Sequence, residues 1–280
     1  MRPLTKALAV VLAALIVVSA AALWQVDRFL NSAVNVPGEG ANFEIAPGTP
    51  FTRVSEGLAE QGIISNPTLL RIYARVSGRA GSVHAGEYFI EPGTTTAGLM
   101  NQFTSGDVLL YSFTIVEGWN QWELLRALHA HPQIDAQISE EDWPELLEEL
   151  GAETGHPEGL FLPETYRFPR NTSDRTVLKQ AYRLMQTVLS EEWPDRAADA
   201  PVASPYEALV LASIVEKETA RTDERNRIAG VFARRLEKRM RLQTDPTVIY
   251  GIGPGFNGNL TRRDLRTDTP YNTYTRGGLP

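Results

Sequence analysis

The feature that most constrains this chain is an uncharged apolar run near its start, from Ala7 to Trp24. The run has 18 residues, and a helix needs roughly 17–25 residues to span the hydrocarbon core of a bilayer. Arg2 and Lys6 precede it, and a basic flank of this kind keeps the N-terminus in the cytoplasm. The aromatic ring of Trp24 suits the lipid–water interface. We therefore predict a cytoplasmic N-terminus and transmembrane anchor over residues 1–24, with the rest of the chain outside the membrane.

Two other structures compete for the same run. Three alanines at residues 20–22 can serve as the cleavage site of a signal peptide, but the apolar core of a signal peptide has only about 7–15 residues. A buried helix of a soluble protein is the other alternative, although the run has no polar face at the helical period. Beyond Trp24, no segment of the sequence is apolar enough to span a membrane.

Composition excludes several classes of protein. The net charge is −7, which argues against a protein that coats nucleic acid. Hydrophobic residues make up 42%, so the chain has enough apolar side chains for an ordinary globular core. Because the chain has no cysteine, thiolate metal sites, iron–sulfur clusters, disulfides and a lipidated cysteine anchor are excluded.

Common cofactor and nucleophile motifs are absent or weak. The sequence has no Walker A motif and no G-x-S-x-G motif. Residues 253–258 fit the letters G-x-G-x-x-G, but the acidic residue that the dinucleotide motif needs about 20 positions later is missing, so we expect a turn-rich loop. The four histidines, His84, His129, His131 and His156, lack the spacing of metal ligands. We predict no metal site and no cofactor.

Turn residues divide the rest of the chain into three parts. Asn, Pro and Gly interrupt residues 25–42, which we expect to form a stalk. Residues 43–110 predict a small α+β module, and residues 111–280 a mixed α/β domain, so the predicted fold class is α+β. The elements expected in the module are a strand over 43–45, a turn over 47–50, a helix marked by Val54, Leu58 and Ile63 or Ile64, a helix starting at Asn66 and Pro67, a strand over 86–90 and a short helix over 96–103.

Two stretches carry opposite charge. Residues 117–164 hold 12 Asp and Glu with one Arg, and residues 221–241 hold 8 Lys and Arg with 3 acids. Runs of this kind are usually solvated faces of the fold. For the acidic stretch the alternative is a metal or cation site, and for the basic stretch it is an anionic partner.

Strong helix signals begin at residue 204. Ser204 and Glu207 have the spacing of a capping box, and Pro205 suits the first helical position. The predicted helix continues through the apolar residues that follow. Thr222 is expected to cap a second helix, whose first turn is acidic and whose last turns are basic.

Glu218 shares the apolar face of the first of these helices. With Leu211 at 0° and about 100° per residue, Ile214 falls at about 300°, Val215 at about 40° and Glu218 at about 340°. A carboxyl group on an apolar face is desolvated and keeps its proton near neutral pH, as a general acid must. The alternative is that the helix frays and Glu218 points to water. Glu216 falls at about 140°, on the opposite side, and is expected to be solvated.

Polar and aromatic residues gather in two later stretches. The first holds Gln243, Asp245 and Tyr250, and the second holds Asn272 and Tyr274. Aromatic faces stack on sugar rings, and amides and carboxylates bond sugar hydroxyls. The five residues are therefore candidates for carbohydrate binding, although the same types are common in ordinary loops.

Several blocks of the sequence carry a family resemblance. They are ASIVEKET at 212–219, MRLQTDPTVIYG at 240–251 and YNTYTRGGLP at 271–280, with EGLFLPETY at 158–166, VEG at 116–118 and AGEY at 85–88. In these blocks, which run in order along nearly the whole chain, the sequence closely resembles the MltG (YceG-like) family of endolytic murein transglycosylases. The N-terminal anchor agrees with the same family.

The resemblance implies a protein held in the cell inner membrane by a single span, with a LysM-like module and a catalytic domain in the periplasm. The implied reaction cuts the β-1,4 bond between N-acetylmuramic acid and N-acetylglucosamine within peptidoglycan glycan strands. It leaves 1,6-anhydro muramic ends and stops strand elongation. The family's catalytic glutamate falls on Glu218, and the implied partners are glycan strands and peptidoglycan synthases, with no nucleic acid. Family members continue past residues 277–280, so we expect a catalytic domain truncated at its C-terminus.

The implied chemistry needs one carboxyl group. Glycosidases ordinarily use two, a proton donor and a nucleophile or base. In a lytic cut the C6 hydroxyl of the sugar attacks its own anomeric carbon, so Glu218 can serve first as acid and then as base. Two alternatives stay open: a non-enzymatic membrane-anchored protein that binds or assembles peptidoglycan, and a hydrolytic muramidase with Asp245 as its second carboxylate.

We predict that the apolar anchor is retained in the mature protein, because its core is longer than that of a signal peptide. Membrane fractionation followed by N-terminal sequencing is expected to find Met1 or Arg2. A mature chain that starts at Leu23 contradicts this prediction.

Overall fold

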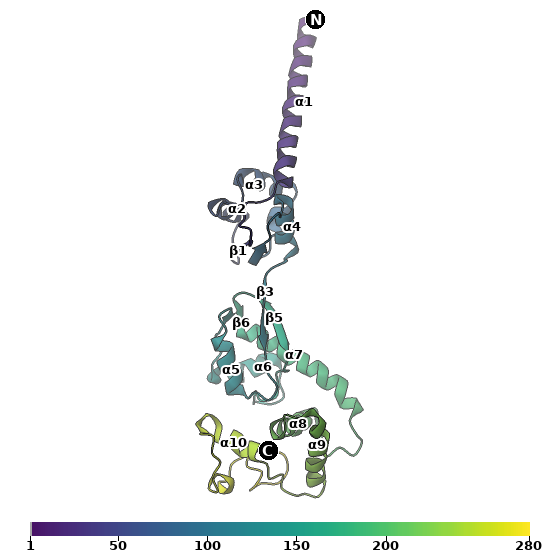
Figure 1. The fold of residues 1–280 in the computed structure, drawn as a ribbon. Coiled ribbons are helices and arrows are strands. Elements are labelled where there is room, and N and C mark those ends of the chain that lie inside the picture. Colours follow the sequence, from purple (N-terminus) through teal and green to yellow (C-terminus); the bar gives the residue numbers. More distant parts are fainter. Residues whose placement is uncertain (1) are drawn as a thin grey trace. The chain divides into compact units, whose positions relative to one another are not determined.

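The structure is a computed structural model that describes the backbone of residues 2–280 and the side chains of residue 8 and residues 10–280 (Figure 1). The chain divides into two compact units, Met1–Tyr111 and Ser112–Pro280. The boundary predicted between residues 110 and 111 lies one residue from this division. Both units combine helices with short strands, so the predicted α+β class is confirmed.

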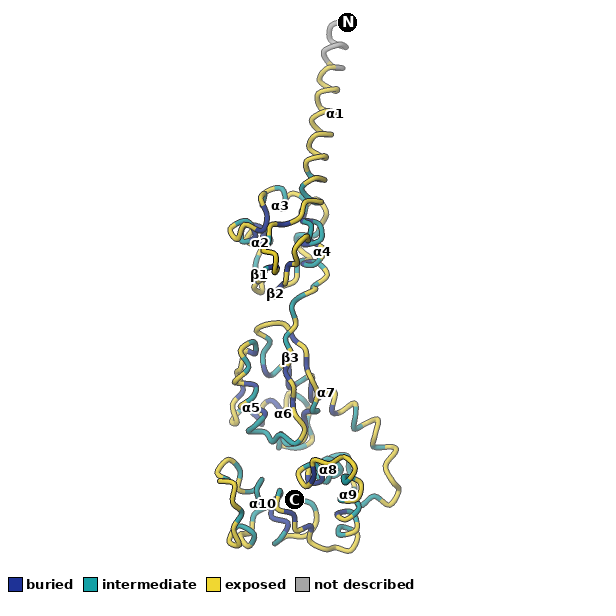
Figure 2. Tube along the Cα trace, in the orientation of Figure 1, coloured by how far each residue is buried: buried dark blue, intermediate teal, exposed yellow. Residues whose placement is uncertain are grey.

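The first unit begins with a long helix, α1, over Arg2–Asn31. Its segment Val10–Asn31 is long and apolar enough to cross a membrane, and none of that apolar window is buried in the protein (Figure 2). A helix that exposes apolar side chains on every face is suited to a bilayer. Its backbone N–H and C=O groups bond to one another within the helix, so they need no water there. The side chains of Arg2 and Lys6, on which the predicted orientation rests, lie outside the described side chains.

Residues 25–42, predicted to be a stalk, belong to α1 and to the first compact unit. Residues 25–31 extend the helix past the predicted anchor. Val34 is buried in the core of the unit, and its N–H donates to the carbonyl of Thr94 at 2.8 Å. Asn35 makes a second backbone bond of this kind. Because the segment covers apolar core and its backbone groups find partners there, it is packed and the prediction of a separate stalk is wrong.

A two-stranded antiparallel sheet organises the first unit. Strand β1, Ala41–Ile45, pairs with β2, Gly86–Ile90, and places Phe43 opposite Tyr88. The other elements are α2 (Phe51–Glu60), α3 (Pro67–Val76), η1 (Arg79–Gly81) and α4 (Thr96–Ser105). They confirm the strands and helices predicted from turn residues. One detail differs: α2 ends at Glu60, so Ile63 and Ile64 lie buried in the loop after the helix instead of marking its last turn.

Aromatic side chains fill the core between the sheet and α4. The ring of Phe103 lies 4.7 Å from that of Tyr88 and 5.9 Å from that of Phe43, centroid to centroid. Each buried aromatic side chain of this size stabilises a fold by roughly 1.5–3 kcal/mol. The Tyr88 hydroxyl donates to the carbonyl of His84 at 2.7 Å, so its polar end is satisfied. Burial raises the pKa of Tyr88 to about 12.

The second unit contains two small sheets and a series of helices. Strand β3 (Leu110–Thr114) pairs with β5 (Thr165–Pro169), and β4 (Ile134–Asp135) pairs in parallel with β6 (Thr172–Ser173). The remaining elements are α5 (Gln121–Ala130), η2 (Glu140–Asp142), α6 (Trp143–Leu150), α7 (Asp174–Glu192), η3 (Trp193–Asp195), α8 (Pro205–Glu218), α9 (Thr222–Glu237), α10 (Asp245–Ile252), η4 (Gly253–Gly255) and η5 (Asp264–Arg266).

Replacing Gly40 in the turn before β1 is predicted to destabilise the first unit. The φ of Gly40 is +86°, and a Cβ atom there would lie 2.5 Å from Cζ of Phe89 and 2.9 Å from the carbonyl oxygen of Ile90. Gly40→Ala is expected to lower the free energy of unfolding of the first unit by roughly 2 kcal/mol or more, because strain in the backbone and overpacking act together. The measurement is pulse proteolysis of the first unit in urea.

Gly38→Ala is the matched control. A Cβ at Gly38 has nothing within 4 Å, so this variant is expected to stay close to wild-type stability. Equal stability of the two variants contradicts the prediction.

Candidate functional site

Helix α8 begins with the cap that the sequence predicts, in a modified form. The Ser204 hydroxyl accepts the N–H of Glu207 at 3.2 Å, and Pro205 occupies the first turn. The carboxylate of Glu207 accepts the N–H of Ala203 at 2.5 Å instead of the N–H of Ser204. The capping box is therefore only half formed, because the acid reaches one residue further back along the chain.

The apolar stripe of α8 packs as predicted up to Val215. Ile214 and Val215 are buried against Phe232 of α9 and against Leu242. This contact fixes α8 and α9 on each other and places the segment after α9 beside the end of α8. The polar residues of the site follow from that placement.

Glu218 is the last residue of α8, and its side chain is exposed. The helix stops here because Thr219 is extended, so the apolar stripe does not continue over Glu218. The Thr244 hydroxyl donates to the Glu218 carboxylate and gives it a fixed partner. The prediction of a desolvated Glu218 on an apolar face is therefore wrong. The alternative holds in part: the helix ends and Glu218 is exposed, but its carboxylate is bonded to buried Thr244.

The turn between α8 and α9 also differs from its prediction. Thr222 was the expected cap, but α9 starts at Thr222 and its capping position is Arg221, which makes no side-chain cap bond. Buried Thr219 organises the turn instead: its hydroxyl accepts the N–H of Arg221 and donates to the Glu224 carboxylate, both at 3.1 Å. The capping prediction missed because the stabilising hydroxyl comes three residues before the helix.

Gln243 has an unusual backbone that shapes the site. Its φ is +51°, in the left-handed region, and its side chain is exposed. Its neighbours Leu242 and Thr244 are both buried, with 0% and 2% exposure. Gln243 then bonds through its N–H to the carbonyl of Thr273 at 3.2 Å.

Asp245 and Tyr274 form a direct pair beside Glu218. Asp245 starts α10, and its Oδ1 accepts the Tyr274 hydroxyl at 2.6 Å. This hydrogen bond, with burial and the negative charges of Asp245 and Glu218, raises the pKa of Tyr274 to about 12. Four of the predicted residues, Glu218, Gln243, Asp245 and Tyr274, thus meet at the N-terminal end of α10.

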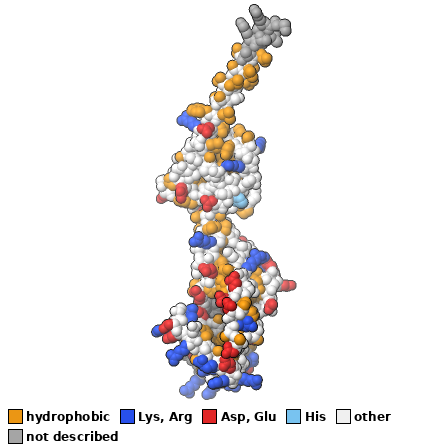
Figure 3. Space-filling view, turned by 90° about the vertical axis from the view of Figure 1, so that its right-hand side faces the viewer, with side chains coloured by type: hydrophobic (Ala, Val, Ile, Leu, Met, Phe, Trp, Pro, Cys, Tyr) orange, Lys and Arg blue, Asp and Glu red, His pale blue; other side chains and the backbone are white. Residues whose placement is uncertain are grey.

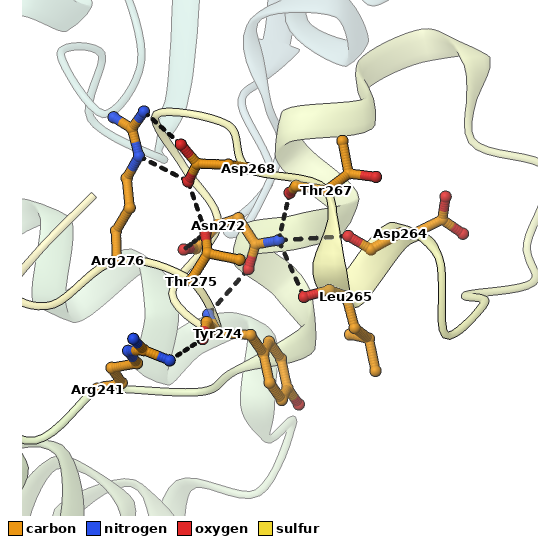
Figure 4. A network of polar contacts seen from close by, with 9 residues as sticks. All are labelled: Arg241, Asp264, Leu265, Thr267, Asp268, Asn272, Tyr274, Thr275 and Arg276. Atoms are coloured by element: carbon orange, nitrogen blue, oxygen red, sulfur yellow. Dashed lines mark hydrogen bonds and ion pairs between the residues drawn. The ribbon is translucent and has the colours of Figure 1, made fainter.

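Asn272 lies in the same region but serves the loop (Figure 4). Its side chain is 0% exposed. The amide nitrogen donates to the carbonyls of Asp264, Leu265 and Thr267 at 3.3, 3.3 and 2.7 Å, and the amide oxygen accepts the N–H of Tyr274 at 2.8 Å. Both ends of the amide are occupied, so Asn272 holds the backbone that presents Tyr274, and we correct the expectation that it contacts substrate.

Tyr250 belongs to a second cluster, at the C-terminal end of α10. Its ring lies 4.9 Å from Tyr271, 5.5 Å from Trp122 and 6.2 Å from His156, centroid to centroid. All four rings are half-buried. Since residues five apart on a helix are separated by about 7.5 Å along its axis, this aromatic cluster and Asp245 occupy neighbouring parts of one helix.

Glu158 interacts with the aromatic cluster through Tyr250. Its carboxylate accepts the N–H of Gln121 at 3.2 Å, and burial raises its pKa while Tyr250 and the charge of Lys217 partly offset that rise. Burial also lowers the pKa of His156. Sequence reasoning gave no role to these groups. The resemblance block at 158–166 was the one signal for Glu158, and His156 lies just before that block. Their contacts join segments far apart in the chain, so local patterns could not predict them.

Glu216 is less solvated than predicted. It forms an ion pair with Arg225 of α9 at 3.0 Å, and 27% of its side chain is exposed. The helical angle was right, but the opposite side of α8 meets α9 here instead of open water. Glu216 therefore has a structural partner and is separate from the Glu218 site.

The described residues offer no ready metal centre. No group of three or more His, Asp or Glu side chains among them is placed to hold a metal ion. What the site at α10 offers is one exposed carboxylate with a hydroxyl donor, one carboxylate–phenol pair and a nearby set of half-buried rings. These groups can exchange a proton and can bind hydroxyl-rich ligands.

Asn272→Ala is predicted to destabilise the second unit by about 2–4 kcal/mol, because it leaves buried carbonyls and one N–H without partners. Urea unfolding followed by tryptophan fluorescence measures the change. Asn226→Ala, an exposed position on α9, is the matched control and is expected to stay within about 0.5 kcal/mol of wild type. An unchanged midpoint for Asn272→Ala, with weaker sugar binding, contradicts the loop role.

Known proteins were compared with this chain. Residues 43–280 match the YceG-like family. The endolytic murein transglycosylase of Bacillus subtilis (strain 168) is 28% identical over 260 residues, covering 85% of this chain and 70% of the relative. The protein of the same name from Streptococcus pneumoniae serotype 2 (strain D39) is 26% identical over 268 residues, and the match spans 84% of this chain but only 48% of the relative. A crystal structure of a YceG-like protein from Listeria monocytogenes has a TM-score of 0.52 at 26% identity and covers 87% of this chain and 85% of that one. Because the family match extends over most of its length, this chain belongs to the YceG-like family.

Proposed function

We propose that this chain is an endolytic lytic transglycosylase that cleaves peptidoglycan glycan strands, the activity for which its curated relatives are named. The observation that carries the proposal is the Glu218 carboxylate, which is exposed to ligand and held by the Thr244 hydroxyl. The bond cut is the β-1,4 link between N-acetylmuramic acid and N-acetylglucosamine. The product is a 1,6-anhydro muramic end, which terminates strand elongation.

In this mechanism Glu218 acts twice. It first gives a proton to the leaving oxygen as the bond from the anomeric carbon breaks. The C6 hydroxyl of the same muramic sugar then bonds to that carbon, and the Glu218 carboxylate takes up the hydroxyl proton. No water is consumed, and Glu218 ends in the protonation state in which it started, so a second carboxyl is unnecessary.

Because Glu218 is exposed, the bound substrate must itself complete the surroundings of the carboxyl group. The interior of the protein does not shield this carboxyl, so the glycan laid over it must exclude water from the reaction. Thr244 limits the motion of the carboxylate before the glycan arrives, and ordered groups of this kind lower the entropic cost of reaching the transition state. This arrangement favours a long polymer that crosses the site over a small diffusing ligand.

Substrate contacts fall to the residues around α10. Asp245 and Tyr274 present a fixed hydrogen-bonded pair to sugar hydroxyls, and exposed Gln243 is free to bond from the turn before α10. Tyr250, with Trp122 of the aromatic cluster, offers half-buried ring faces to a sugar ring.

In this proposal the first unit attaches the enzyme to the membrane and to the glycan. Its separate core supports a LysM-like, glycan-binding module, which we place over residues 43–110 of that unit. Helix α1 is a single-pass anchor in the inner membrane, so the bulk of the chain lies in the periplasm. There the enzyme meets newly made strands, which makes peptidoglycan synthases its natural partners.

Glu218→Gln tests the proposal most directly. The change keeps the shape and the bond with Thr244 but removes the titratable proton, so the rate of anhydro-end formation is expected to fall by about 10²–10⁴-fold with the fold intact. Mass spectrometry of digested peptidoglycan gives the rate, and circular dichroism checks the fold. Glu216→Gln is the matched control and is expected to keep most activity, because Glu216 faces Arg225.

Asp245→Asn separates the lytic reaction from the hydrolytic alternative. A lytic enzyme still makes anhydro ends in this variant, only more slowly because the pair with Tyr274 is weakened. Reducing ends in place of anhydro ends from the wild-type protein would establish a hydrolytic muramidase, and binding without any cleavage would leave the non-enzymatic role. An inactive Glu216→Gln beside an active Glu218→Gln would refute the assignment of Glu218.

A further inference from the structure

The C-terminal part of the second unit is basic in an otherwise acidic protein. Residues 221–276 hold twelve Lys and Arg against six Asp and Glu, a net charge of +6, whereas the whole chain carries −7. In the lower part of Figure 3, Lys and Arg side chains gather on the surface of this region. Excess positive charge of this kind favours the binding of an anionic partner.

Three of these cations form what we call the basic stripe: Arg227 and Arg234 of α9, and Lys238, the residue that caps its C-terminus. At about 100° per residue they fall within about 40° of one another, and all three are exposed. The buried face of α9, marked by Phe232, points away from them by about 120° or more. Among the described side chains, none of the three has an acidic partner within ion-pair distance.

The helix itself accounts for the basic stripe only in part. Arg234 and Lys238 lie at the C-terminal end of α9, where positive charge favours the helix dipole, but Arg227 lies before the last turns, and like charges four residues apart, as at Arg234 and Lys238, repel each other. Other cations of the same helix are engaged inside the fold: Arg225 pairs with Glu216 at 3.0 Å, and Arg235 donates to the carbonyl of Leu242. The contrast separates structural arginines from a set that is left open to a ligand.

Two other basic residues of this region contact the segments that form the Glu218 site. Arg235 of α9 braces Leu242, two residues before Thr244, and Arg241 donates to the carbonyl of Tyr274 at 3.0 Å. Beyond Tyr274, the loop that Asn272 holds displays three further exposed arginines, Arg262, Arg263 and Arg266. A polymer that crosses Glu218 therefore passes close to Arg235 and Arg241, and Arg235 directly follows Arg234 of the basic stripe.

We propose that the basic stripe binds the carboxylates of the peptide stems that hang from the muramic sugars of the glycan strand. This inference rests on the proposed function and names a determinant of its specificity. The sugar backbone of the strand offers hydroxyls and neutral amides, so the stems supply its negative charge. Guanidinium groups bind carboxylates through paired hydrogen bonds, which lysine cannot match. An anionic membrane is the other polyanion near an anchored protein, but the contacts of Arg235 and Arg241 with the segments of the Glu218 site favour the substrate.

The test compares two forms of one polymer. Uncrosslinked glycan strands that carry stems, and the same strands stripped of stems by an amidase and then amidated at the lactyl carboxylates that the amidase frees, are immobilised on a sensor, and the detergent-solubilised full chain is passed over both. Replacing Arg227, Arg234 and Lys238 together by Gln is expected to weaken binding to stem-bearing strands by about 10-fold and to leave binding to stripped strands unchanged. The wild-type preference for stem-bearing strands is expected to shrink in high salt, because salt screens exposed charges.

The matched control replaces three exposed arginines on other helices, Arg75, Arg126 and Arg183, by Gln. It changes the net charge by the same amount and is expected to bind both polymers as wild type does. Equal losses for the two triple variants, or a stripe variant that loses affinity for stripped strands as well, overturn the inference. So does a loss seen only on vesicles of phosphatidylglycerol and phosphatidylcholine.

Anhydro ends are counted on the same two polymers. If wild-type protein forms none from either polymer, the proposed function fails. If it forms them and the stripe variant binds and cleaves both polymers as wild type does, the inference alone fails.

Discussion

The hydrogen bond from Thr244 to Glu218 ties the end of α8 to the start of α10, and the rest of the site depends on it. Thr244 is itself held in place, because it is buried and its N–H donates to the Thr273 hydroxyl at 3.1 Å. Gln243 before it adopts a left-handed backbone, at a cost of roughly 1–2 kcal/mol, which burial of Leu242, worth roughly 1.5–3 kcal/mol, offsets. A buried threonine is thus the means by which an exposed carboxylate acquires a fixed position.

Local signals in the sequence predict the frame of this protein well and its site only in part. The helix start at Asn66 and Pro67 and the strand over 86–90 depend on near neighbours in the chain, and the structure agrees with both predictions. The identity of Glu218 as the candidate acid follows from the family resemblance, and its position at a helix end does not conflict with it. Its exposure was not predictable from a helical angle, because the angle assumes that the apolar neighbours continue for another turn, whereas Thr219 ends the helix.

The remaining misses have one physical origin. Asn272 is a type of residue that binds sugars and that also satisfies loops, and the rings that gather around Tyr250 were not predicted; both outcomes depend on partners far along the chain. The amide of Asn272 meets carbonyls that a bend brings back from residues 264–267, while Tyr250 meets rings from residues 122 and 156. Helix α10 escaped prediction for a related reason, since Asp245 and Pro246 at its start are equally typical of a turn.

Two features of the second unit are incomplete in the free protein, and they lie on connected segments. Glu218 is an exposed acid, and among the described side chains the basic stripe has no acidic partner within ion-pair distance. A folded chain gains little stability from either, because an exposed carboxylate and unpaired like charges contribute nothing to its core. In our proposal one long ligand meets both groups, because its sugars cover the carboxylate and its acidic side branches pair with the cations. The proposed substrate class, a branched anionic polymer, thus matches groups that the fold leaves exposed as well as those it holds in place.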